Sequence, residues 1–460
     1  MSSDVHESGS SGRLFHYFSI IGLKPDEGLL PFEGNAAHSQ ISEESPLLPP
    51  LTRSYKSEVL GYYPDFVGSI PFDKDAVQML SFPKGLQLRT QKHSLKPHFH
   101  PFVITKEDGS QYFGFSYTFY EEVNTKQICT ALYSLQSVYL TNVSCAQGKP
   151  SPGPSVDPHN THSLPRQIRL CSPQAADAKN FYDITKDKLF VSKCITLVGP
   201  NPALMPAWKF LSELYKVFIE CDTDTISLEA YVYNLLYEVP APPRGKCLSF
   251  TCIKKEHLCQ RPPLNELPLF EYSLQEFFAL LGIETIMQLL SCVLLENQII
   301  ILSSDYYRLM LVAESVCALI FPFAWQNVYV PILPSSLLHF LDAPVPFIMG
   351  IQTEVENDVI RIPNEANLCL LDIDRGSIEV PEDLPQLPNK AEIHKELLLY
   401  FEKYAANSST KYDRNLNEQL IDYKHRRRRN PSDSTPEFLQ NDPLIRRDSI
   451  FFNVFFFIVF

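Results

Sequence analysis

Two histidines and a glutamate are the first residues in this sequence that could do chemistry, because together they could bind a metal. His98 and His100 are two residues apart, so on a β-strand both imidazoles would lie on one face. With the carboxylate of Glu107 they would offer nitrogen and oxygen ligands suited to a transition metal. The alternative, which we favour, is a pair of half-exposed histidines at the entrance of a hairpin.

Three cysteines and a histidine form a second candidate group, in this case for zinc. They are Cys247, Cys252, His257 and Cys259. Their spacing matches no strong zinc pattern, and nothing downstream completes a tight ligand pair. Other cysteines lie inside apolar stretches, where a thiol behaves as a small hydrophobic side chain. We therefore expect neither a structural zinc ion nor a disulfide framework.

The motifs of ordinary enzymes are missing from the sequence. It contains no G-x-x-x-x-G-K-[ST], no G-x-G-x-x-G and no G-x-S-x-G, and only 17 of its residues are glycine. Asp372 and Asp374 could share a strand face as paired carboxylates, but surface acids before a turn explain them better. We expect no chemical catalysis by this chain and no cofactor.

The charge balance excludes some partners and leaves others open. The net charge of −13 disfavours a nucleic-acid binder. The basic run at 424–429 (KHRRRR) could hold the chain at an anionic membrane, could be a nuclear address, or could be a solvated linker. The membrane alternative would use Arg426, Arg427, Arg428 and Arg429. No secretory signal opens the sequence, so we expect a cytoplasmic protein.

The elements that position these residues fall into two parts, separated by the prolines at 240–243. In the first part, Asp-Gly between two alternating stretches predicts a hairpin. Asn124 is expected to cap the helix that follows it. The expected strands are 14–23, one starting near 86, 99–105, 112–119 and 189–198. The expected helices are 73–79, 124–138, 203–218 and 227–238.

The second part alternates helices with apolar strands, which predicts an α/β layer with parallel pairing. Ser273 and Gly282 should start and stop a helix, and Ser303 and Asp305 should cap another. The expected helices are 274–281, 286–294 and one whose apolar face runs from 309 to 320. The expected strands are 298–302, 328–333, 346–351 and 368–373.

These elements predict four regions along the chain. Residues 1–12 are expected to be disordered, and 13–240 to form a first lobe with loops at 33–53 and 144–180. Residues 241–395 should form an α/β lobe, and 396–460 a mostly disordered basic linker with a short apolar tail. The apolar run at 450–460 (IFFNVFFFIVF) is too short to span a bilayer, which needs roughly 20 residues.

Several long motifs resemble DENN-domain proteins over roughly residues 13–395. PFDKDAVQMLSFPKGLQL and FGFSYTFYEE are similar to the upstream part of that family. LLENQIIILSSDYYRLMLVAESVCALIFPFAWQNVYVPILPSSLLHFLDAPVPFIMG resembles its central part almost throughout, and NELPLFEYSLQEFFALLG and PNEANLCLLDID extend the similarity. RSYKSEVL, ITKEDGS and YNLLYEVPAPP look closest to the subgroup that also carries RUN and PLAT modules.

The resemblance implies a fold and a function. The fold would be an N-terminal longin-like α+β lobe followed by an α/β lobe with a mainly parallel sheet. The function would be guanine-nucleotide exchange on a Rab GTPase held in a cleft between the lobes, at Golgi or endosomal membranes. Candidates for the partner surface are Tyr306, Arg308, Asp342 and Pro344.

One departure from the family leaves an alternative open. The family continues into a downstream DENN segment that completes the second lobe, whereas this chain turns to KHRRRRNPSDS and an apolar tail. The alternative is a non-catalytic protein that binds a Rab or another trafficking partner. A metal-dependent enzyme at His98 and His100 is the third hypothesis.

Overall fold

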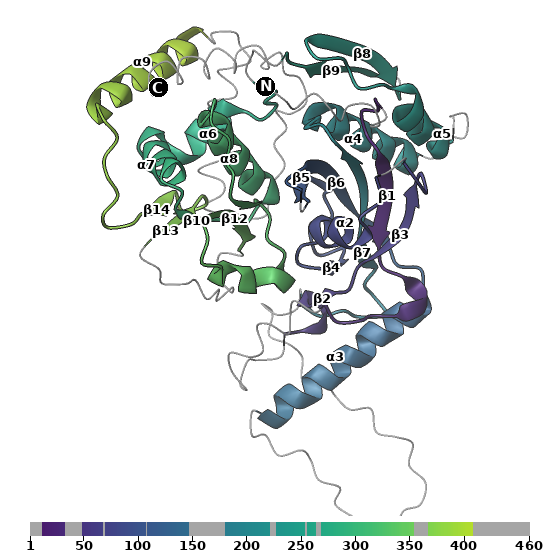
Figure 1. The fold of residues 1–460 in the computed structure, drawn as a ribbon. Coiled ribbons are helices and arrows are strands. Elements are labelled where there is room, and N and C mark those ends of the chain that lie inside the picture. The colour runs from purple at the N-terminus through teal and green to yellow at the C-terminus, as the bar shows by residue number, and fades with distance from the viewer. Residues whose placement is uncertain are drawn as a thin grey trace, which may run out of the picture.

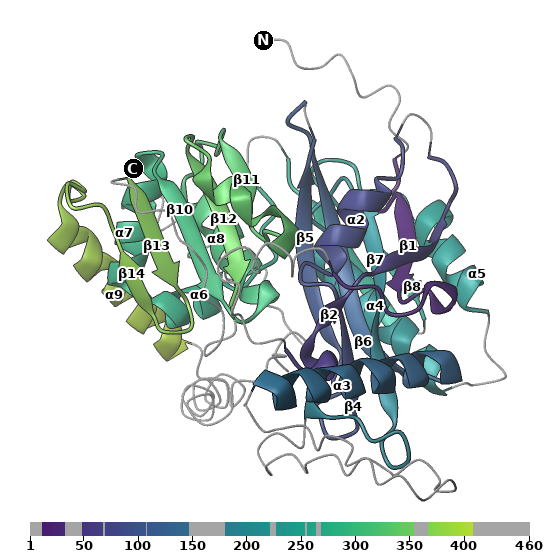
Figure 2. The same cartoon turned by 90° about the horizontal axis from the view of Figure 1, so that it is seen from below.

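The computed structural model contains two lobes that lie side by side, each built around its own sheet (Figures 1 and 2). The first lobe is rich in strands, and the second alternates strands and helices, as the fold class predicted. Residues described by the structure are 12–32, 48–67, 70–106, 108–146, 180–220, 227–253, 255–263, 268–353 and 367–407. The basic run at 424–429, the apolar tail, residues 1–11 and most of the two predicted loops lie outside them.

The first lobe is organised around β7 (Leu189–Gly199), a long buried strand. Along one side β7 pairs antiparallel with β4 and β1, and along the other with β6. Beyond these, β3 pairs with β1 and β5 with β6, so β3 and β5 lie at opposite ends of the sheet. The remaining strands of the sheet are β1 (Tyr17–Gly22), β2 (Ser54–Tyr55), β3 (Glu58–Tyr63), β4 (Leu86–Thr90), β5 (His98–Thr105) and β6 (Gln111–Glu122).

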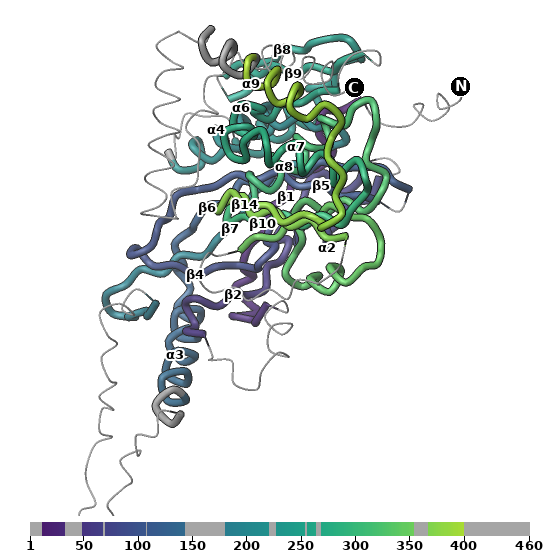
Figure 3. Tube along the Cα trace, turned by 90° about the vertical axis from the view of Figure 1, so that its left-hand side faces the viewer, coloured from purple at the N-terminus to yellow at the C-terminus, as the bar shows by residue number. Residues whose placement is uncertain are grey.

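Helices pack around this sheet, and one of them, α3, reaches away from it. The helical elements are η1 (Pro25–Glu27), η2 (Pro50–Thr52), α2 (Lys74–Ser81), α3 (Lys126–Ala146), α4 (Leu204–Glu220), α5 (Leu228–Tyr233) and η4 (Asn234–Glu238). In Figures 1 and 3, α3 extends from one end of the lobe. The predicted helix 227–238 is a short α-helix followed by a π-helical turn.

The predicted N-cap at Asn124 is wrong, for a reason visible in the sheet. The N–H of Val123 donates to the carbonyl oxygen of Leu189 at 2.9 Å, so sheet pairing continues up to the residue before Asn124. The first helical N–H groups bond instead to the carbonyl oxygen of Thr125. The helix therefore begins only at Lys126.

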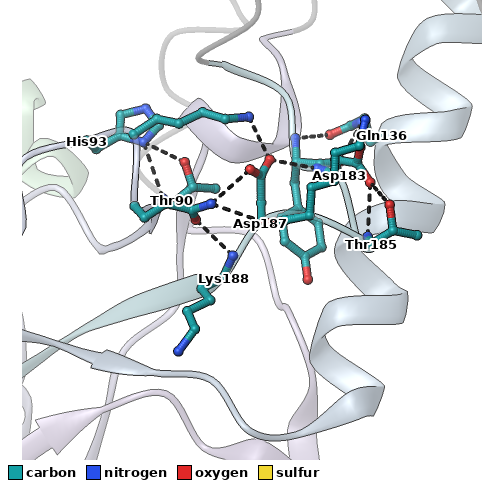
Figure 4. A network of polar contacts seen from close by, with 11 residues as sticks. Thr90, His93, Gln136, Asp183, Thr185, Asp187 and Lys188 are labelled. Atoms are coloured by element: carbon teal, nitrogen blue, oxygen red, sulfur yellow. Dashed lines mark hydrogen bonds and ion pairs between the residues drawn. The ribbon is translucent and has the colours of Figure 1, made fainter.

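A polar network fixes residues 180–188, which lead into β7 (Figure 4). Gln136 on α3 exchanges two hydrogen bonds with the backbone of Tyr182, at 2.9 and 3.1 Å. The carboxylate of Asp187, whose side chain is 3% exposed, accepts from Lys92 Nζ at 2.6 Å and from Gln91 Nε2 at 3.1 Å. It also accepts from the N–H of Asp183 at 3.0 Å. The network thus ties three separate segments of the first lobe together.

A two-stranded hairpin follows the proline cluster and packs beside the first lobe. Its strands are β8 (Lys246–Cys252) and β9 (Lys255–Arg261). Lys255 Nζ lies 2.7 Å from the carboxylate of Glu213 on α4. The hairpin therefore adjoins α4 rather than the sheet of the second lobe.

The second lobe is an α/β layer whose strands are mainly parallel, as predicted. β10 pairs parallel with β12 and β13, β11 pairs parallel with β12, and β14 pairs antiparallel with β13. Its elements are α6 (Leu274–Leu281), α7 (Ile283–Leu294), β10 (Gln298–Ser303), α8 (Tyr306–Leu319), β11 (Val328–Val330), η5 (Ser335–Asp342), β12 (Phe347–Gln352), β13 (Leu368–Asp372), β14 (Ser377–Glu379) and α9 (Lys390–Asn407).

Buried apolar side chains join the two lobes. A single connected cluster contains core residues from both, for example Phe102 and Leu197 in the first lobe and Leu309 in the second. A smaller cluster around Phe347 and Met349 lies on the other face of the second sheet, under η5. In the described part of the chain no single helix has the length and apolarity to cross a membrane. The pair α6 and α7, bent by 101°, passes that test only when counted together.

Candidate partner-binding site at the seam between the lobes

The two lobes meet where α8 packs against the edge strand β5, which we call the seam. The ring centroid of Tyr306, at the start of α8, lies 5.0 Å from the ring centroid of His100 on β5. The Nε2 atom of His100 lies 3.1 Å from the carbonyl oxygen of Leu80 at the end of α2. The seam is thus built by α2 and β5 on one side and by α8 on the other.

A second contact ties η5 of the second lobe to the end of α2. The N–H of Ser335 donates to the carbonyl oxygen of Pro83 at 2.9 Å. The hydroxyl of Ser336 approaches the sulfur of Met79 at 3.6 Å. These bonds place η5 at one border of the seam.

Residues 268–273, which lead into α6, supply a third contact between the lobes, through a half-buried carboxylate. Glu271 lies just before α6, and its Oε2 accepts from the N–H of Met205 in the first turn of α4 at 2.9 Å. Burial raises the pKa of Glu271 to about 7, although backbone donors and Lys209 oppose the shift. Glu271, which precedes the first helix of the second lobe, therefore caps α4 of the first lobe.

Beneath the seam, the start of α8 is fixed by a buried ion pair. Arg308 Nη1 lies 3.1 Å from Asp374, and the two side chains are only 6% and 10% exposed. The same carboxylate accepts from the N–H of Ser304 and, at 3.3 Å, from the hydroxyl of Ser303. The interpretation of Asp374 as a surface acid is thus wrong, because Asp374 joins the chain after β13 to the start of α8.

Two more acids surround this ion pair. Asp305 caps α8 by accepting from the N–H of Tyr307 at 2.9 Å, as predicted. Burial raises the pKa of Asp305 to about 6 and that of Glu276 to about 7, while the charge of Arg308 lowers both. The start of α8 therefore contains one cation among three carboxyl groups, of which Glu276 is buried and Asp305 and Asp374 are half-buried.

The four candidate partner residues occupy different environments. Tyr306 lies in the seam and is half-buried, whereas Asp342, the last residue of η5, and Pro344, between η5 and β12, are exposed. Arg308 is 5% exposed, which favours a structural role over direct contact with a partner. Whether any of the four binds a partner stays a prediction.

The two candidate metal groups do not form metal sites among the described residues. His100 is 1% exposed, and burial lowers its pKa to about 4 and that of His98 to about 3, so both imidazoles are neutral near pH 7. The expectation that both histidines are half-exposed is therefore wrong for His100. Glu107 lies outside the described residues. In the hairpin, Cys252 and Cys259 are buried, whereas Cys247 is exposed on the opposite face.

Two exposed apolar surfaces escaped the sequence analysis. Phe340 and Val345 are 46% and 43% exposed on either side of the turn that holds Asp342. At the far end of the first sheet, Tyr62, Tyr63 and Phe66 are 40%, 39% and 69% exposed. Sequence periodicity gave no signal for them, because an exposed aromatic residue has the same pattern as a buried one.

In a comparison with known protein families, two domain models match parts of the two lobes. The uDENN domain model matches residues 57–119, and the DENN (AEX-3) domain model matches residues 190–376. The second match begins within the first lobe, at β7, and ends beyond β13. The two matches therefore include both sides of the seam.

Curated relatives are similar over part of their length. The "DENN domain and WD repeat-containing protein SCD1" of Arabidopsis thaliana is 30% identical over 200 residues, 43% of this chain and 17% of that protein. "Elicitor of plant defense protein 1" from Fusarium odoratissimum and from Gibberella zeae is 24% identical over 403 residues, 75% of this chain and 43% and 34% of those proteins. The chain thus spans less than half the length of each of these relatives. It carries a uDENN domain followed by a DENN (AEX-3) domain.

Proposed function

We propose that this protein is a guanine-nucleotide exchange factor that promotes GDP release from a Rab GTPase in membrane trafficking. DENN domains are typical of Rab exchange factors. The observation that carries the proposal is the presence of uDENN and DENN domains on both sides of one seam. Exposed apolar side chains, Phe340 and Val345, lie at the border of the seam, which suits binding of a protein surface.

Exchange of this kind requires no bond making by the chain. The factor binds the nucleotide-free GTPase more tightly than the GDP-bound form and so weakens the hold on GDP. A thousandfold acceleration corresponds to about 4 kcal/mol of differential binding. The ion pair and the interlobe hydrogen bonds would hold the binding surface of this protein in a shape that complements the deformed switch region of the GTPase.

The proposal also includes the subgroup of the family and the location in the cell. The stretches RSYKSEVL, ITKEDGS and YNLLYEVPAPP support the subgroup that carries RUN and PLAT modules. We place the protein in the cytoplasm, peripheral to Golgi or endosomal membranes, with Arg426 to Arg429 available for anionic lipids. A tagged full chain observed by microscopy, with these four arginines replaced by glutamine, tests the location and the role of the basic run.

The deciding experiment measures release of fluorescent GDP from a panel of purified Rab GTPases, with and without the full chain. We expect acceleration for a small subset of the panel. Failure to accelerate release from any Rab contradicts exchange activity. If the chain nevertheless captures a Rab in a pull-down, the non-catalytic binding alternative replaces our proposal.

A further inference from the structure

Residues 339–345, which are the last residues of η5 and the turn that leads into β12, form a rigid corner of the second lobe. Leu341, 3% exposed, anchors it in the small core cluster around Phe347. The N–H of Ala343 donates to the carbonyl oxygen of Phe340 at 3.1 Å. The side chain of Gln298 on β10 donates to the carbonyl oxygen of Ala343 at 2.9 Å. The backbone of the corner is thus fixed from three sides.

This fixed backbone presents apolar side chains to solvent. Phe340 is 46% exposed and Val345 is 43% exposed, and the exposed Pro344 lies between them. The Phe340 ring has its centroid 4.5 Å from that of the exposed His339. Apolar side chains held out by a rigid backbone lose little conformational entropy on binding, so they suit the centre of an interface.

The charge of the corner restricts what can cover it. Asp342 is exposed between the apolar side chains, and the corner contains no lysine or arginine. A partner that packs on Phe340 must therefore present apolar side chains beside a lysine or arginine. An anionic membrane surface does not meet this requirement, because Asp342 would repel it.

The corner also lies next to the seam. η5 begins with the hydrogen bond from Ser335 to Pro83 of the first lobe, and it ends in the corner. Figure 1 shows η5, the green helix of the second lobe nearest β2, facing the first lobe. A protein bound on the corner is thus placed to extend towards the seam.

We propose that the corner 339–345 is the apolar anchor of the GTPase-binding surface, with Phe340 and Val345 packed on apolar side chains of the GTPase and Asp342 facing a basic residue. The inference rests on the proposed function and deepens it, because it names the residues that carry affinity. Asp342 and Pro344 enter it as neighbours of the two apolar side chains.

The test uses the full chain and the Rab on which it acts most strongly in the exchange panel. Binding to the nucleotide-free GTPase and the rate of GDP release are measured for Phe340→Ala, Val345→Ser and Asp342→Lys. The matched control is Phe66→Ala, which removes a ring that is 69% exposed beside β3, at the far end of the first sheet. Because all four side chains are well exposed, we expect the variants to melt within a few degrees of the wild type.

We expect Phe340→Ala to weaken binding at least tenfold, Val345→Ser and Asp342→Lys to weaken it about three- to tenfold, and Phe66→Ala to leave it unchanged. Wild-type affinity in Phe340→Ala, or an equal loss in Phe66→Ala, overturns the assignment of the corner while exchange activity stands. A wild-type chain that neither binds nor activates any Rab overturns both proposals. A variant that loses its melting transition is replaced by Phe340→Leu, for which a smaller loss of binding at wild-type stability is expected. Wild-type affinity in Phe340→Leu then overturns the assignment.

Discussion

Removing the carboxylate of Asp374 should greatly lower the free energy of unfolding of the second lobe. In Asp374→Ala, the guanidinium of Arg308 stays in a site that is 6% exposed but loses the oxygen 3.1 Å away. The same substitution removes the acceptor for the N–H of Ser304. Breaking a buried pair by removing one partner costs about 3–5 kcal/mol. An exposed pair would be worth about 0–1 kcal/mol.

The assay is urea unfolding followed by the fluorescence of Trp325, which packs against the core beside the end of α8. The chain has 2 tryptophans, so Trp208→Phe makes Trp325 the single reporter. In this background we compare Asp374→Ala, Arg308→Met and the double variant. The double variant should lose less stability than the sum of the two single losses, because neither member of the pair is left without the other. Single losses below about 1 kcal/mol, or strict additivity, would refute the structural reading of the pair.

Three further predictions concern buried polar groups. Burial raises the pKa of Glu276 to about 7, so the contribution of this group to wild-type stability falls as pH rises from about 4.5 to 7. In urea unfolding, Glu276→Gln should therefore be up to about 3 kcal/mol more stable than wild type at pH 8, and the difference should close near pH 4.5. Burial lowers the pKa of His100 to about 4, so the contribution of its neutral imidazole to the free energy of unfolding is complete above pH 6.5 and is lost as pH falls towards 4. His100→Phe should therefore reduce the slope of stability against pH on the acid side by about 1.4 kcal/mol per pH unit. An unchanged slope would contradict the burial argument. Asp187→Ala should lower the melting temperature, because the carboxylate accepts from three donors. The same variant should leave GDP release unchanged at 20 °C, because none of the residues labelled in this network (Figure 4) takes part in the contacts that form the seam.

Local signals in the sequence were sufficient for much of the second lobe. Ser273 caps α6, Asp305 caps α8 and Gly282, with φ of 77°, ends α6, because each effect depends on residues within one helical turn. The apolar run at 298–302 became the central strand β10. The predicted strand 328–333 is shorter, since Pro331 follows Val330 and has no N–H for the ladder.

The features that escaped prediction depend on residues far apart in the chain. Asp374 is an acid before a turn in the sequence, and only folding brings it to Arg308, 66 residues earlier. Phe340 lies in a run rich in leucine and proline, where periodicity cannot separate exposed from buried side chains. His100 is hidden by α8 of the other lobe, which no local pattern could indicate.

The central claim is that one partner binds across both lobes at the seam. Hydrogen–deuterium exchange of the full chain, alone and with a nucleotide-free Rab, tests it directly. We predict slower exchange at 79–83 and in β5 on the first lobe, together with 335–345 on the second. Slower exchange confined to one lobe, or found only beside β3, would contradict the claim.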